Sequence, residues 1–236
     1  MNFNLIFIIG ILPFLLFTVV FFYLIVIQKN AFTQQLSLFR PTHELPQKRE
    51  AYMQNVRKHR KYISIFLSMI IILPFIALVL AISKENLEKI VQMFMAASDN
   101  TKILIIFSIM PIVIIFYIII YILRRNEKAQ RMLLEQMSEE DFDFLSKVKN
   151  YLNFFNRYSP PFLLCNKRLY IFLSFGIREI DITEIKSVEG IEGEKRSTLV
   201  HIQSDKKKTT IVLSGKVFSF LKDIIEKYNP SLKGYK

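Results

Sequence analysis

The sequence has few of the residues on which disulfide-stabilised and catalytic proteins depend. Its 236 residues include one cysteine, Cys165, six glycines, three histidines and no tryptophan. A single cysteine excludes an internal disulfide. No GxGxxG, Walker, HExxH or GxSxG pattern occurs, and the histidines are too far apart in the sequence to form a metal motif. We therefore predict no catalytic residues, no cofactor and no metal site, and expect that the chain is not an enzyme.

Charge is missing from three long stretches of the chain. Residues 3–27, 63–82 and 103–123 contain no Asp, Glu, Lys or Arg, although the whole chain carries 32 basic and 20 acidic residues. As a helix, the third stretch would be about 31 Å long, close to the hydrocarbon thickness of a bilayer. The predicted fold class is therefore membrane α-helical, with three transmembrane helices at these ranges.

The net charge of +12 is concentrated between the first two apolar stretches. Residues 28–62 carry eight basic and two acidic side chains, and the positive-inside rule places such a loop in the cytoplasm. Arg124 and Arg125 would then mark the cytoplasmic end of the third span. We predict a multi-pass protein of a bacterial cytoplasmic (inner) membrane with its N-terminus outside, and no nucleic-acid partner.

Each apolar stretch has a proline near its middle. Pro13, Pro74 and Pro111 would kink their helices, because proline lacks the backbone donor that an interior helical position needs. A transport site would instead need an ionisable residue at membrane depth, and the three stretches contain no Asp, Glu, Lys or Arg. We interpret residues 1–123 as a packed transmembrane region.

The rest of the chain changes from helical to alternating hydrophobic periodicity. Residues 124–160 are predicted to form a helical stalk and an amphipathic linker helix, for which Ser138 is the N-cap. In 161–236, short alternating runs predict antiparallel strands, and 214–228 predicts a closing helix ended by Asn229-Pro230. This region is predicted to be a small cytoplasmic α+β domain, with Ile202, Leu213, Leu221 and Ile225 in its core.

These features resemble a known family. The alternating strands, the segment Asp181–Val188, two charged hairpins and the closing helix with its FLKDIIEKY core are similar to a bacterial PH-like domain, as in the YcxB-like membrane proteins. The resemblance covers residues 162–230. It implies an antiparallel PH-like sheet or split barrel closed by a C-terminal helix, and it implies no catalytic residues.

Basic clusters are the candidate binding residues. Two groups at predicted hairpin tips, and one group in the loop before the second apolar stretch, could contact anionic lipid headgroups. A solvated charged turn is the alternative for the tips, and a topology signal is the alternative for the loop. The candidates are Lys195, Arg196, Lys206, Lys207, Lys208, Arg57, Lys58, Arg60 and Lys61.

Together these patterns predict a binding protein. We expect a membrane-tethered, non-catalytic scaffold with a cytoplasmic PH-like interaction module, whose partner is either a protein or an anionic lipid. One alternative is a small accessory subunit of a membrane transport or export complex, and another is a membrane immunity or protection protein.

Overall fold

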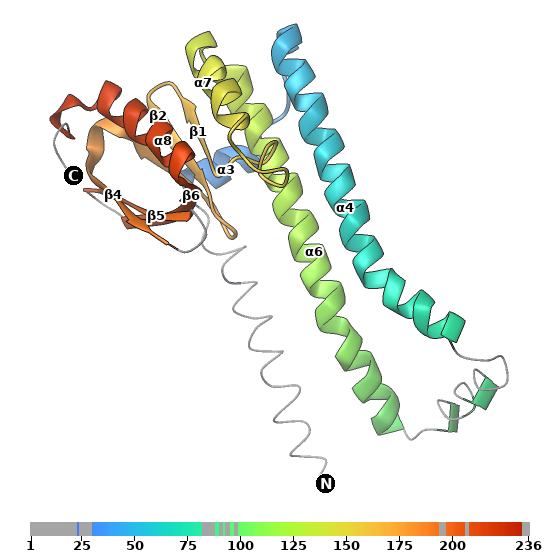
Figure 1. The fold of residues 1–236 in the computed structure, drawn as a ribbon. Helices are drawn as coiled ribbons and strands as arrows, with labels where there is room; N and C mark the ends of the chain where they lie inside the picture. The colour runs from blue at the N-terminus through green and yellow to red at the C-terminus, as the bar shows by residue number, and fades with distance from the viewer. Residues whose placement is uncertain are drawn as a thin grey trace. The chain divides into compact units, whose positions relative to one another are not determined.

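A computed structural model provides the three-dimensional structure (Figure 1). It describes residues 23, 30–81, 88–89, 92, 95–96, 99–193, 197–205 and 208–232, without the side chains of 74–75, 77–81 and 99–112. The chain divides into two compact units. We call Met1–Ile27 with Lys58–Arg124 the helical unit, and Gln28–Arg57 with Arg125–Lys236 the α+β unit.

The structure contradicts the predicted transmembrane fold class. Within the described residues, no helix contains an apolar stretch long enough to cross a membrane. The apolar side chains described in the second and third stretches, 63–73 and 113–123, span about 16 Å each as helix, against about 30 Å of hydrocarbon. The first stretch, 3–27, lies outside the described residues apart from Tyr23. The predicted three spans and the predicted multi-pass inner-membrane location are corrected accordingly.

The long helices include the third apolar stretch and nearly all of the second, and they extend beyond them. Helix α4 (Gln47–Ala81) follows Pro46, and α6 (Asp99–Gln136) continues past Arg125 without interruption. Helix α7 (Glu139–Lys149) starts at the predicted N-cap, since the Ser138 hydroxyl accepts a hydrogen bond from the Asp141 backbone N–H at 3.1 Å.

The α+β unit contains two three-stranded antiparallel sheets. The first has the order β1-β2-β3 and the second the order β4-β5-β6, so consecutive strands pair within each sheet. Every alternating run of the sequence lies in one of these strands. Their bounds are β1 (Phe162–Cys165), β2 (Arg168–Phe172), β3 (Ile177–Asp181), β4 (Ile185–Glu192), β5 (Ser197–Ser204) and β6 (Lys208–Ser214).

The turn between β1 and β2 attaches the first sheet to two helices. Asn166 and Lys167 have φ angles of 51° and 63°, which place both residues of this two-residue loop in the left-handed region. The Asn166 side chain donates to the Gln136 carbonyl at 3.1 Å, and its backbone N–H donates to the Asp141 carboxylate at 3.0 Å. These contacts give the buried Asp141 a partner.

Helix α8 (Gly215–Tyr228) closes the second sheet, as Figure 1 shows. Its apolar side packs on both sheets, and one cluster of buried residues joins α8 to strands β1 to β6. The four predicted core residues are all in this cluster and at most 4% exposed: Ile202, Leu213, Leu221 and Ile225.

A second core lies on the other face of the β1-β2-β3 sheet. It contains Leu163, Cys165 and Tyr170 from the sheet, packed against α6, α7, the first turns of α4 and a further helix. That helix is α3 (Ala31–Leu38), in a stretch where the sequence predicted a basic loop. The first sheet is therefore covered on both faces, which explains why all four residues of β1 are buried.

The amphipathic linker helix predicted within residues 124–160 is short in the structure. Phe142, Leu145 and Val148 are buried on α7, but α7 ends at Lys149 and Phe155 is 57% exposed. The apolar spacing continues after the helix, while the backbone turns away at Asn150–Leu152. Periodicity alone does not show where a helix ends.

Candidate functional site: a charged recess between two sheet edges

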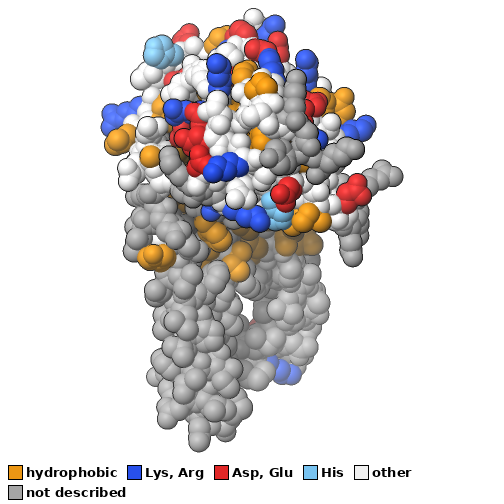
Figure 2. Space-filling model, turned by 90° about the vertical axis from the view of Figure 1, so that its left-hand side faces the viewer, with side chains coloured by type: hydrophobic (Ala, Val, Ile, Leu, Met, Phe, Trp, Pro, Cys, Tyr) orange, Lys and Arg blue, Asp and Glu red, His pale blue; other side chains and the backbone are white. Residues whose placement is uncertain are grey.

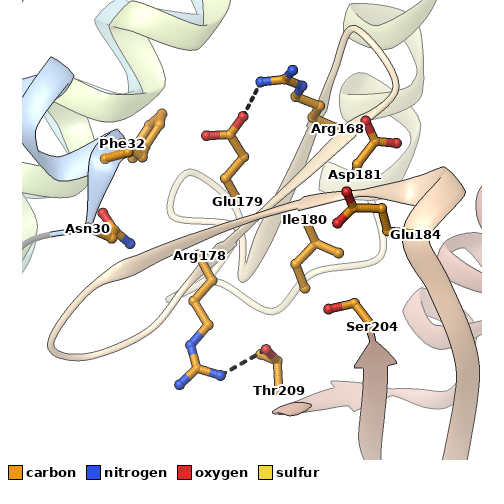
Figure 3. A pocket seen from close by; sticks show the side chains of 11 residues that line it. Asn30, Phe32, Arg168, Arg178, Glu179, Ile180, Asp181, Glu184, Ser204 and Thr209 are labelled. Carbon is orange, nitrogen blue, oxygen red and sulfur yellow. Dashed lines mark hydrogen bonds and ion pairs between the residues drawn. The ribbon is translucent and has the colours of Figure 1, made fainter. Parts of the chain in front are cut away.

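The α+β unit has a recess of about 330 Å3 where edge strand β3 approaches edge strand β6 (Figure 3). Edge strands carry backbone groups that no neighbouring strand pairs, and so they are natural binding surfaces. Side chains from β2, β3, β5, β6 and the start of α3 line the recess. The charged and hydroxyl-bearing members are Arg168, Arg178, Glu179, Asp181, Glu184, Ser204 and Thr209.

Arg178 extends from β3 to β6. Its Nη1 donates to the Lys208 carbonyl at 2.7 Å and to the Thr209 hydroxyl at 2.9 Å. Both acceptors are uncharged, so the guanidinium keeps its full positive charge at this position. The side chain therefore joins the two sheet edges and supplies a cation to the recess.

A second arginine on the recess is paired with a carboxylate. Arg168 on β2 forms an ion pair with Glu179 on β3, which Figure 3 also shows. The hydrogen bond and the negative charge of Glu179 raise the pKa of the Arg168 guanidinium above its usual value. The charges of Arg168 and Glu179 therefore largely cancel, and they add little to the net charge of the recess.

The other end of the recess carries two carboxyl groups and one arginine. Figure 3 shows Asp181 and Glu184 on the same side, away from Arg178, with Arg168 beside Asp181. One oxygen of Asp181 accepts hydrogen bonds from the Thr183 N–H and hydroxyl at 3.0 and 2.7 Å. These two bonds lower the pKa of Asp181 below its usual range, since they stabilise the ionised form. Asp181 is thus held as an anion.

The N-terminus of α3 forms the remaining wall. Asn30 is the N-cap of α3 and accepts a hydrogen bond from the Thr33 backbone N–H at 2.8 Å. Its amide nitrogen donates to the carbonyl of Ile177 on β3. Phe32 is buried and packs against Tyr170 with ring centroids 5.0 Å apart. Residues more than a hundred positions apart in the sequence therefore meet at one site.

None of the predicted basic binding residues that the structure describes lines this recess. Lys195, Arg196, Lys206 and Lys207 lie outside the described residues. Lys208 is exposed at the start of β6, where its carbonyl accepts the hydrogen bond from Arg178. Figure 2 shows acidic and basic side chains interspersed on the visible face rather than one basic surface.

The basic residues predicted in the loop before the second apolar stretch lie on α4. Arg57 is already paired, with Glu50 at 3.3 Å and Glu127 at 3.9 Å. Lys58 is exposed, and Arg60 and Lys61 line a groove in the helical unit. These four residues thus occupy nearby positions on one helix but have different surroundings.

Sequence reasoning missed the recess itself. Arg178 and Asp181 lie in the alternating run 177–182, which predicts a strand but indicates no binding site. One available signal was the spacing of Asn30 and Thr33, which is typical of a helix N-cap. No local pattern indicates that this helix adjoins β3.

The described part of the chain has few groups suited to metal binding or thiol chemistry. It contains no group of three or more His, Cys, Asp or Glu side chains placed to hold a metal ion. The ring of His201 is hydrogen-bonded to the Thr210 hydroxyl at 2.8 Å. Cys165 is buried, and burial raises the pKa of its thiol to about 11.

Comparison with protein-family models, with curated proteins and with solved structures found no match.

Proposed function

We propose that this chain is a non-catalytic binding protein, and that its α+β unit recognises a polypeptide partner in the recess between β3 and β6. The observation that carries the proposal is the position of this recess. It lies at two sheet edges, and it presents a cation, Arg178, and an anion, Asp181, at different ends.

A polypeptide suits this arrangement better than a lipid headgroup. The recess is lined by three carboxylates and two guanidinium groups, and this excess of negative charge disfavours a phosphate. A peptide segment can carry a basic and an acidic side chain a few residues apart, and extended peptides commonly add to sheet edges. The mixed charge therefore favours a protein partner here.

The protonation states also favour binding over proton transfer. A general acid or base works best when its pKa lies near the working pH. In the recess the pKa of Asp181 is lowered and that of Arg168 is raised, so both shifts move away from neutrality. Groups held in their charged forms are suited to fixed electrostatic recognition.

A peptide-display selection against the full chain tests the proposal. We expect the enriched peptides to contain one basic and one acidic residue, and to bind the purified chain in a titration. Arg178→Gln and Asp181→Asn should each weaken binding about fivefold, which corresponds to about 1 kcal/mol for a partly exposed charge pair. Asn at position 181 keeps an oxygen acceptor for Thr183, so local structure is preserved.

Two changes on α8 serve as matched controls. Lys222→Gln and Asp223→Asn remove one charge of each sign at positions outside the recess lining. Affinity should stay within about twofold of the unmodified chain, because screened charges at a distance contribute little. Enriched peptides that bind all four variants equally well would refute the recess as the binding site.

A further inference from the structure

The helical unit has its own groove, which the proposed polypeptide site does not use. It lies between α4 and α6 and has a volume of about 630 Å3. Ser64 and Ile65 from α4 face Phe116, Tyr117 and Ile120 from α6 across it. Apart from Ser64 and the basic residues at one end, the lining is aromatic and aliphatic.

One end of this groove is basic. Arg60 and Lys61 from α4 lie there with Arg124 from α6, because the two helices run in opposite directions along the groove. Lys61 and Arg124 are exposed. No acidic side chain is among the described residues that line the groove. The basic end is thus complementary to an anion.

Away from its basic end, the groove continues into an apolar hollow. A second hollow of about 410 Å3 continues along α4 from Ser64 to Ile76. That part of α4 is about 16 Å long from Ile65 onward, at the rise of an α-helix. Its large apolar side chains are at least half exposed: Ile65, Met69, Ile72, Leu73 and Ile76. Such a continuous exposed apolar surface is typical of a binding site.

We infer that this groove binds a phospholipid with an anionic phosphate headgroup, the phosphate at Arg60, Lys61 and Arg124 and an acyl chain along α4. Arginine and lysine form charge-assisted hydrogen bonds with phosphate oxygens. The acyl chain covers the exposed apolar side chains and removes them from water. One molecule therefore satisfies both ends of the groove.

The hydrogen-bonding capacity of the groove favours a lipid over a polypeptide. The polar side chains of the apolar hollow are Ser64 and Ser68, and the Ser68 hydroxyl already donates to the Ser64 carbonyl at 2.9 Å. A polypeptide lying there would lose water from backbone groups that find few partners. A hydrocarbon chain has no such groups to satisfy.

Calorimetric titration of the full chain with three probes tests this inference. The probes are dihexanoyl phosphatidic acid, dihexanoyl phosphatidylcholine and inorganic phosphate, and the short chains keep the lipids monomeric. We expect phosphatidic acid to bind about tenfold more tightly than either of the others, because phosphatidylcholine is zwitterionic and inorganic phosphate has no acyl chain. Its affinity should fall as salt is added.

Variants with matched controls assign the site. Lys61→Ala with Arg124→Ala should weaken phosphatidic acid binding about tenfold or more, whereas Lys58→Ala, exposed on the same helix and outside the groove, should not. Ile65→Ser should weaken the binding of both lipids, and Ile115→Ser should not. Equal binding of all three probes, or unchanged binding in the double variant, would overturn the inference. Because these residues are outside the β3–β6 recess, this result is independent of the proposed polypeptide site.

Discussion

Arg49 joins three elements of the α+β unit through one buried side chain. Its Nη1 donates to the carbonyls of Leu134 and Met137, at the C-terminal end of α6, at 2.8 and 2.6 Å. Its Nη2 pairs with Glu139 at the start of α7. The last carbonyls of a helix have no hydrogen-bond donor within the helix, and a buried cation can donate to them. Arg49 thereby holds α4 against the turn between α6 and α7.

Replacing Arg49 by methionine should destabilise the chain. The two carbonyls would lose their donor in a buried position, at a cost of about 1 to 3 kcal/mol. Arg57→Met is the matched control, because Arg57 lies on the same helix but is exposed, and its ion pairs contribute less than about 1 kcal/mol. Urea unfolding followed by circular dichroism measures both. Equal midpoints for the two variants would show that Arg49 does not cap α6.

Because of the buried thiol of Cys165, we expect the chain to lose stability at high pH. Burial raises the pKa of its thiol from 9.0 to about 11, so the folded state holds the neutral form. The contribution of Cys165 to the free energy of unfolding is fully present below pH 9. It is lost between pH 9 and 11, because the thiol ionises in the unfolded chain before it ionises in the folded one. At pH 8 the folded thiolate should be about a hundredfold rarer than the unfolded one. Iodoacetamide labelling followed by mass spectrometry should therefore be slow for the folded chain and fast in urea; equal rates would contradict this.

Helix α3 shows where the sequence was informative and where it was not. Strands, α7 and α8 follow from local signals, namely alternation, the Ser138 cap and the apolar side of residues 217–225. Helix α3 is only eight residues long, too short to be stable alone, and the charges around it favoured a loop. Its stability comes from burial of Phe32 and Leu36 in a core formed by distant segments. Only the folded chain reveals such a helix.

Two leucines on α3 test this account within a single helix. Leu36 is 3% exposed and Leu38 is 82% exposed. Leu36→Ala should lower the free energy of unfolding by about 2 to 5 kcal/mol, because it leaves a cavity in the second core. Leu38→Ala should change it by less than about 0.5 kcal/mol. Thermal and urea unfolding of the full chain would measure the difference, and similar losses for both variants would mean that α3 is not packed as described.

At the scale of the molecule, the α+β unit is assembled from both sides of the second and third apolar stretches. Residues 28–57 and most of 125–160 cover one face of the β1-β2-β3 sheet, while α8, the second sheet and Val148 of α7 cover the other. The recess depends on the same assembly, since α3 forms one of its walls. The sequence could therefore predict the strands and most of the core. It could not predict the recess, because no local pattern connects residues 30–32 with β3 and β6.

Hydrogen exchange of the full chain with and without an enriched peptide tests the central proposal most directly. Binding at the recess should slow exchange in β3, at the start of β6 and around residues 30–33, because these segments surround it. Exchange in α8 should be unchanged, since α8 contributes no residue to the lining. Protection confined to α8, or to segments outside the recess, would show that the α+β unit binds its partner elsewhere.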